Sequence, residues 1–165
     1  MTTKKIAVER ATFVSKRAFD DVLGRLDKGI GRTNFGELSR RMNGTATLEE
    51  YESIVHGAVG SAELMEFMRL DLGAVLQRYP AVRAYRIVRI IAGNPLIMKQ
   101  MVEHVPDAGS YAPVTILVFE RKDGVHVSYD TMASYLADCG SEKALQVAKD
   151  LDAKVLRLLT EATAR

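Results

Sequence analysis

The chain has 165 residues, of which 47% are hydrophobic and 27% are charged, enough for one globular domain with its own core. No low-complexity segment, internal repeat or linker divides it, which excludes a disordered or repetitive protein. The net charge is +2, with basic and acidic residues interspersed, so we expect no nucleic-acid partner.

Cysteine and histidine content bears on compartment and metal chemistry. Cys139 is the one cysteine and cannot form an internal disulfide, which favours a reducing compartment. The first six residues lead into mixed polar sequence, without the apolar run of a secretion signal or a membrane span. We therefore expect a cytoplasmic protein without membrane contact. The three histidines are scattered and lack zinc-site spacing, so no metal or other cofactor is expected.

The first predicted elements are a strand and a helix. Residues 12–14 are predicted to be extended, and Ser15 is a suitable cap for the helix that follows. Apolar residues recur there at helical spacing up to Ile30, where Gly29 and Gly31 end the pattern. From Thr33 to Gly44 the periodicity weakens and small polar residues accumulate. This stretch is predicted to be a loop with a short helical turn.

A second helix is predicted after Thr47, because Thr47 and Glu50 have the spacing of a capping box. The next segment allows two interpretations. Its apolar residues suit one long helix from Ser61 to Tyr79, but Leu64 to Leu70 could also be a buried strand ahead of a shorter helix. Periodicity alone favours the helix.

Residues 85–91 are rich in β-branched and aromatic side chains and are predicted to form a strand. Asn94 and Pro95 then supply a cap and a first-turn proline for another helix. An irregular connection follows, rich in proline and glycine, and Val114 to Glu120 is predicted to be the next strand.

A hairpin is predicted at Lys122-Asp123-Gly124. A three-residue loop with Gly124 left-handed would place Phe119 opposite Val127 and Leu117 opposite Tyr129, on the core face. His126 would then face away from the core, toward Glu120. A two-residue turn over Asp123-Gly124 would instead scatter apolar residues over both faces.

The carboxyl-terminal part is predicted to be helical. Thr131 to Leu136 forms a short helix that Gly140 ends, and Ser141 caps a final amphipathic helix. Residues 1–165 are therefore expected to form a single domain.

Several spaced motifs together resemble one known family. They are Gly93-Asn94-Pro95, Pro113 at the head of a strand, the Asp123-Gly124 hairpin, Val127-Ser128-Tyr129 and Tyr135-Leu136. They resemble the family catalogued as domain of unknown function 302, over about residues 85–140 and extendable upstream. The resemblance implies an α+β domain, often self-associating, with helices packed on an antiparallel sheet, and it favours a strand at 64–70. It implies no reaction or cofactor.

The chain also departs from the family pattern. Residues of about 33–61 form a helical segment inserted where the family has a short connection. Leu72 follows Asp71 where many members carry histidine, and Thr131 stands where proline is common. Because Leu72 takes the place of that histidine, any role that the histidine has in other members cannot be carried over to this chain.

The sequence predicts a binding site at the start of the Pro95 helix, although Asn94-Pro95 can also be explained as helix initiation alone. Asn94 would offer hydrogen bonds, Tyr111 and Tyr129 would frame the ligand, and Arg89 or His104 would neutralise an anion. We therefore expect a small-molecule-binding or sensory domain for an anionic or polar ligand, and the family resemblance implies a homodimer.

Two alternatives stay open. A metal-independent enzyme could use His104 or Tyr129 as acid or base, although no catalytic motif is present and no catalytic residue is assigned. A structural interaction module could use the 33–61 segment for docking.

Overall fold

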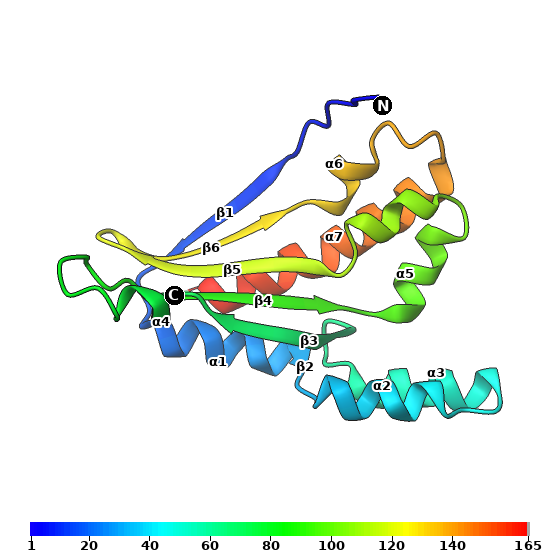
Figure 1. Cartoon of the computed structure of the whole chain (residues 1–165), viewed down its shortest axis with the longest axis horizontal. Helices are drawn as coiled ribbons and strands as arrows, with labels where there is room; N and C mark the ends of the chain where they lie inside the picture. Colours follow the sequence, from blue (N-terminus) through cyan, green and yellow to red (C-terminus); the bar gives the residue numbers. More distant parts are fainter. Residues whose placement is uncertain (165) are drawn as a thin grey trace.

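The computed structural model describes residues 1–164 (Figure 1). Its elements in chain order are β1 (Arg10–Ser15), α1 (Phe19–Gly29), β2 (Ile30–Gly31), α2 (Phe35–Asn43), α3 (Leu48–Ala58), β3 (Leu64–Asp71), α4 (Gly73–Leu76), β4 (Ile87–Gly93), α5 (Pro95–Val102), a 3₁₀ helix (Pro106–Ser110), β5 (Val114–Arg121), β6 (Gly124–Asp130), α6 (Met132–Leu136) and α7 (Glu142–Thr163). This α+β arrangement confirms the predicted fold class.

One six-stranded sheet, in the order β1-β6-β5-β4-β3-β2, organises the domain (Figure 1). Every neighbouring pair is antiparallel except β2 and β3, which run parallel. The sheet is therefore mixed, a minor correction to the expected antiparallel one. The two-residue strand β2 continues directly from α1 and pairs at the sheet edge, Ile30 with Leu64.

Within residues 1–164, the helices that pack on the sheet cover one of its faces (Figure 1). Burial alternates along β5, where Val114, Ile116 and Val118 are buried toward the core and their neighbours on the other face are partly exposed. In β6, residues 125–129 are buried on both faces. The long helix α7 lies behind the strands in Figure 1, and α1 and α5 pack beside it. Its cap is as predicted, because the Ser141 hydroxyl accepts a hydrogen bond from the Ala144 amide. Within residues 1–164, no helix layer covers the opposite face of the sheet, which we call the open face.

Helices α2 and α3 form a separate lobe beside the start of α5 (Figure 1). Its small core consists of the buried residues Leu38, Met42, Val55, Ala58 and Met65. The predicted loop at 33–44 was wrong, since Phe35–Asn43 is a helix. Asn34 caps it by accepting from the Glu37 amide at 3.2 Å, and two buried side chains four residues apart suffice to anchor it.

The predicted cap at Ser15 was also wrong. Strand β1 continues through Ser15, which pairs with Val125, and α1 begins at Phe19. The Ser15 hydroxyl instead donates to the Thr163 carbonyl at 3.0 Å. It therefore ties the end of β1 to the end of α7.

The β5–β6 hairpin differs from its predicted register by one residue. Val118 faces Val127 and Ile116 faces Tyr129, because Lys122 and Asp123 alone form the turn between Arg121 and Gly124. His126 consequently lies opposite Phe119 rather than facing Glu120, and it is buried on the open face. Its Nε2 lies 2.9 Å from Asp123 Oδ1.

The open choice at 64–70 is settled in favour of a strand, β3, as the family resemblance implied. Tertiary pairing with β4 overrides the helical spacing there, and a bulge between Glu66 and Met68 accounts for the mixed pattern. A short helix, α4, follows.

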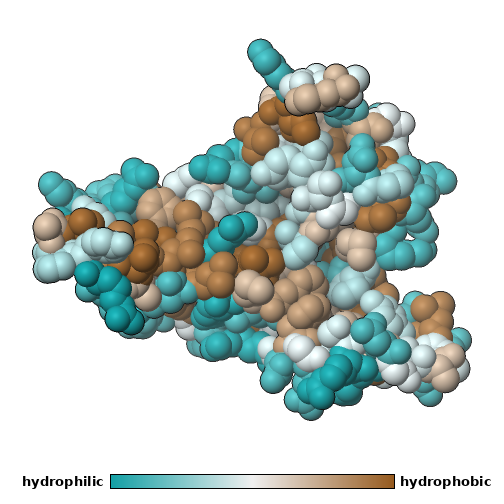
Figure 2. Space-filling model, in the orientation of Figure 1, coloured by the Kyte–Doolittle hydropathy of each residue, from teal (hydrophilic) through white to brown (hydrophobic). Residues whose placement is uncertain are grey.

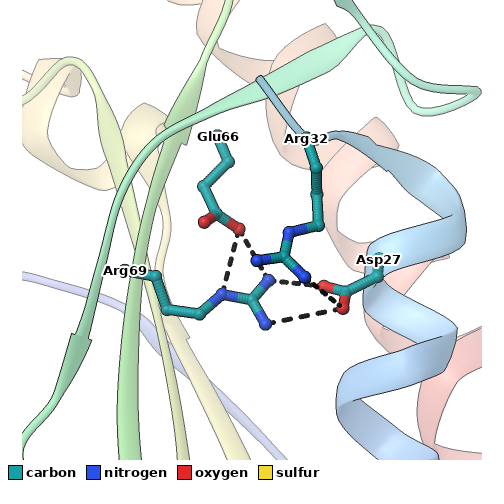
Figure 3. Close-up of polar contacts among 4 residues, drawn as sticks. All are labelled: Asp27, Arg32, Glu66 and Arg69. Atoms are coloured by element: carbon teal, nitrogen blue, oxygen red, sulfur yellow. Dashed lines mark hydrogen bonds and ion pairs between the residues drawn. The ribbon is translucent and has the colours of Figure 1, made fainter. Parts of the chain in front are cut away.

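Strand β3 is joined to α1 by an ion-pair cluster (Figure 3). Arg69 donates to Glu66 Oε2 from Nε at 3.0 Å and from Nη2 at 2.6 Å, and it also donates to Asp27. Arg32 Nη1 lies 3.4 Å from Asp27 Oδ2. The cluster sits at the edge of the sheet, away from the two hollows described below.

Among residues 1–164, no helix combines the length and the apolar character that crossing a bilayer requires.

Candidate functional site

The open face of the sheet carries an apolar band interrupted by polar groups. Figure 2, in the same orientation as Figure 1, shows hydrophobic residues gathered over the strands on this face. Val14, Met68 and Leu72 are exposed there by 51%, 52% and 40%. The strands therefore leave a surface that solvent or a ligand can reach.

A polar cleft of about 530 Å³ lies on this face, between the strands and the segments that follow β6 and precede β5. Its lining combines charged, hydroxyl and apolar groups: Arg10, Leu72, Arg89, Ser110, Tyr111, Pro113, Val114, Thr115, Leu117, Ser128, Tyr129, Asp130, Met132 and Tyr135. The volume is in the range of small-molecule sites in proteins.

The charges of the polar cleft do not cancel. Arg10 and Asp130 face each other across β1 and β6 and form a bidentate pair, with Nε–Oδ1 at 2.6 Å and Nη2–Oδ2 at 2.8 Å. The hydrogen bond from Arg10 lowers the pKa of the Asp130 carboxyl below its ordinary value. This pair is neutral as a unit. One positive charge, that of Arg89, is left over in the cleft.

Arg89 stands in the middle of β4 and projects onto the open face. Its neighbours across the sheet are Leu70 and Leu117, and its one hydrogen bond within residues 1–164 runs from Nη2 to Thr115 Oγ1 at 3.3 Å. No carboxylate of the described chain lies within ion-pair distance of it. A guanidinium between apolar neighbours keeps most of its donors available for a carboxylate or phosphate.

Two tyrosines form an aromatic wall of the polar cleft. The rings of Tyr111 and Tyr135 are stacked, with centroids 4.5 Å apart and planes 10° from parallel. The Tyr135 hydroxyl donates to Asp130 Oδ2 at 3.4 Å. Both rings are partly buried, so the wall offers flat apolar surface beside the charged groups.

Tyr129 borders the same cleft, but its hydroxyl is engaged in the core. It donates to Asp152 Oδ1 on α7 at 2.5 Å. Burial, followed by the negative charge of Asp152, raises the pKa of the Tyr129 hydroxyl far above its ordinary value. Tyr129 therefore stays a neutral hydrogen-bond donor and is poorly suited to act as a base.

A second hollow, the apolar cavity, has a volume of about 460 Å³ and lies between α5 and the α2–α3 lobe. It is lined by Phe35, Met42, Tyr51, Phe67, Gly93, Asn94, Pro95, Ile97, Met98, Met101, Val102, Gly109, Ala112, Pro113, Val114 and Leu151, among which no side chain is charged. This hollow is at the helix start where the sequence placed the ligand.

Asn94 lines the apolar cavity, but both polar atoms of its side chain already have backbone partners. Oδ1 accepts from the Leu96 amide at 2.9 Å, and Nδ2 donates to the Glu63 carbonyl at 3.0 Å. Pro95 has no N–H, so few amides are free at this helix start. His104 lines neither hollow; its Nε2 lies 3.8 Å from Glu103 Oε1 on the surface.

The residues predicted to form one site therefore lie in different parts of the structure. Arg89, Tyr111 and Tyr129 meet at the polar cleft, Asn94 lies at the apolar cavity, and His104 lies at neither. Within residues 1–164, no group of three His, Cys, Asp or Glu side chains is placed to hold a metal ion.

A family model described as "Domain of unknown function DUF302" matches residues 38–162. The chain belongs to this family. The match spans β3 to β6, nearly all of α7, and the lining of both hollows except Arg10 and Phe35. It confirms the resemblance inferred from the motifs, and the family name carries no activity.

A solved member of the DUF302 family has the same fold. The crystal structure of an uncharacterised conserved DUF302 protein from Bacillus stearothermophilus superposes with a TM-score of 0.64 at 10% sequence identity. The alignment covers 93% of this chain and 97% of that one. Comparison with curated proteins found no match.

Sequence reasoning missed Arg10, Asp130 and Tyr135 in this DUF302 domain. Arg10 and Asp130 are 120 positions apart, and only the pairing of β1 with β6 brings them together. Tyr135 belongs to a family motif, but its stacking on Tyr111 depends on where α6 turns back over the sheet. No local pattern signals either contact.

Proposed function

We propose that the protein is a small-molecule-binding domain whose ligand is an anion held in the polar cleft. The observation that carries this proposal is the unbalanced charge of Arg89 beside the stacked rings of Tyr111 and Tyr135. Arg89 would bind a carboxylate or phosphate in a bidentate manner, and the Thr115 hydroxyl would add a donor. A planar group of the ligand would lie against the tyrosine wall.

The anion is assigned to the polar cleft rather than to the start of α5 for a physical reason. At α5, Asn94 already satisfies the Leu96 amide and Pro95 supplies none, so an anion would find little to bind. On the open face, an arginine with one weak hydrogen bond remains available. We therefore place the anion at Arg89 and not at Asn94, where the sequence had predicted it.

Isothermal titration calorimetry with benzoate tests the proposal, with uncharged benzamide as the matched probe. We expect benzoate to bind the wild-type protein, and Arg89→Gln to weaken that binding about tenfold or more, since a charged hydrogen-bond partner is lost. The control is Arg83→Gln, because Arg83 is exposed and lies over Tyr85, outside the cleft. Equal benzoate binding by wild type and Arg89→Gln would reject the site.

We also propose that the protein acts as a homodimer through the open face. The apolar side chains of Val14 on β1, Met68 on β3 and Leu72 just after β3 are exposed on a sheet face that no helix layer covers within residues 1–164. Because Leu72 also lines the polar cleft, a second copy would close one side of the site.

The oligomeric state tests the dimer separately from the ligand. In light scattering coupled to size exclusion, Met68→Glu should shift the protein to the monomer, because it places a charge in an apolar contact. Leu48→Glu is the control, since Leu48 is 64% exposed on the α3 lobe, away from the open face. A wild-type monomer would reject this part of the proposal.

The working compartment that we propose is the cytoplasm, where Cys139 would stay reduced. An enzymatic role for Tyr129 or His104 receives less support. The Tyr129 hydroxyl is hydrogen-bonded to Asp152, and His104 borders neither hollow.

A further inference from the structure

The polar cleft and the apolar cavity adjoin. Pro113 and Val114, at the start of β5, line both of them. Gly93, the neighbour of this segment on β4, has no side chain, and a Cβ there would meet Pro113 Cβ at 3.2 Å and Phe67 Cε2 at 3.4 Å. Pro113 and Phe67 thus pack closely around Gly93, and Pro113 lies at the boundary that the two hollows share.

The chemistry of the two hollows is complementary. The polar cleft has an unbalanced guanidinium and several hydroxyl groups, whereas no charged side chain lines the apolar cavity. The one amide side chain of the cavity, Asn94, directs both of its polar atoms to backbone partners. A ligand group inside the cavity would therefore find apolar contacts and be selected for an apolar character.

The walls of the cavity come from two parts of the chain. On one side Phe35, Met42 and Tyr51 belong to the α2–α3 lobe, within the segment at about 33–61 that we propose is inserted relative to the family pattern. Phe35 also packs on Phe67, with ring centroids 4.5 Å apart. On the other side Met98 and Met101 belong to α5, and flexible methionines suit an adaptable apolar site.

We propose that the ligand of this protein is an amphipathic anion, with its charged head at Arg89 and an apolar tail that passes Pro113 into the cavity between α5 and the α2–α3 lobe. This inference rests on the proposed function, because it extends the anion of the polar cleft. It gives the inserted segment a role, namely to build one wall of the tail site.

Straight-chain carboxylates from butyrate to decanoate are the probes, measured by calorimetry on the full chain. We expect the association constant of the wild type to rise about fourfold with each added methylene until the cavity is filled, because each buried CH₂ is favourable by about 0.8 kcal/mol. Butyrate reports on the head site alone, and the increase with length reports on the tail site.

Gly109→Leu is designed to fill the cavity. Gly109 lines the cavity, and a Cβ built there meets nothing within 4 Å, so there is room for a side chain to begin at this position. Gly24→Leu is the matched control, because a Cβ at Gly24, on α1, is also unobstructed and lies outside both hollows. Met98→Gln is a second variant. Glutamine is about as long as methionine, and it would place a polar amide at a partly exposed position in the lining of the apolar cavity.

The inference is supported if the increase of the association constant with chain length is lost in Gly109→Leu and Met98→Gln but kept in Gly24→Leu. Butyrate should bind equally to the wild type and to all three variants. The inference is overturned if wild-type affinity does not change with chain length while binding still depends on Arg89; the proposed anion site then survives. It is also overturned if the two cavity variants keep the wild-type dependence. If alcohols of equal length bind as well as the carboxylates and Arg89→Gln has no effect, both proposals fail.

Discussion

The Tyr129 hydroxyl donates a hydrogen bond to Asp152 across 2.5 Å, and both side chains are buried. The same carboxylate accepts from the Met132 amide at 2.8 Å and from the Ala133 amide at 2.9 Å. These are the first amides of α6, a helix without a side-chain cap of its own. Asp152 on α7 therefore caps α6 from a distance and fixes the segment that carries Tyr135 over the polar cleft.

Removing this carboxylate should be costly. We expect Asp152→Ala to lower the free energy of unfolding by about 3 kcal/mol, because three buried donors lose their acceptor. Tyr129→Phe should lower it less, by about 1 to 2 kcal/mol, because Asp152 keeps both amides. Urea unfolding measures both values. Equal losses in the two variants would show that the amide contacts to α6 contribute nothing.

The same site predicts a pH dependence of stability. Burial raises the pKa of the Asp152 carboxyl above its ordinary 3.8, although the hydrogen bonds from Tyr129, Ala133 and Met132 oppose the rise. A carboxyl with a raised folded pKa stabilises the fold fully below its unfolded pKa, and this contribution is lost as pH rises through the folded pKa. The stability of the wild type relative to Asp152→Asn should therefore decrease as the pH rises above the ordinary carboxyl pKa of 3.8. Unfolding curves at several pH values measure it, and a constant difference would contradict the assignment.

Local signals predicted the helix starts at Thr47, Asn94 and Ser141, but they missed the starts of α1 and α2. Ser141 and Asn94 each accept from an amide two or three positions later, so the information lies within one turn of the chain. The hairpin register, in contrast, depends on β1. Gly124 has a φ of 143°, and a Cβ there would lie 2.5 Å from the Ser15 carbonyl oxygen, a contact between segments more than 100 positions apart. Turn preference alone cannot include such a contact.

In the candidate site too, local sequence predicted some residues, whereas contacts between distant segments determined the others. Tyr111 and Arg89 were predicted from residue type, because an amphipathic ring and a cation among apolar neighbours are unusual in a strand region. Their partner groups Arg10 and Asp130 come from opposite ends of the chain and are adjacent only through the sheet order. Sequence therefore identified the kind of group, while the strand order determined which groups share a cleft.

A close backbone contact at the base of the α2–α3 lobe predicts a strong glycine requirement. A Cβ on Gly31 would lie 1.9 Å from the Ala58 carbonyl oxygen, and neither backbone can give way easily. We expect Gly31→Ala to lower the free energy of unfolding by about 3 kcal/mol. Gly57→Ala is the control: its Cβ meets nothing within 4 Å in α3, so the change should stabilise the protein by about 0.5 to 1 kcal/mol. Thermal melting distinguishes the two, and a tolerated Gly31→Ala would contradict this packing.

The ion-pair cluster in Figure 3 predicts an asymmetric response to the loss of Arg69. Burial lowers the pKa of the Arg69 guanidinium, but hydrogen bonds to Asp27 and Glu66 outweigh this effect and raise it overall. Arg69→Met should lower the free energy of unfolding by about 3 kcal/mol. Asp27 would keep Arg32 as a partner, whereas Glu66, whose side chain is 11% exposed, would have none.

The second substitution therefore decides where the cost lies. Adding Glu66→Gln to Arg69→Met should recover most of the lost stability, because it removes the buried charge without a partner. Adding Asp27→Asn should recover little, since Arg32 still balances Asp27 in the single variant. A double-mutant cycle by urea unfolding measures both. Equal recovery by the two additions would mean that solvent, rather than Arg69, balances the charge of Glu66.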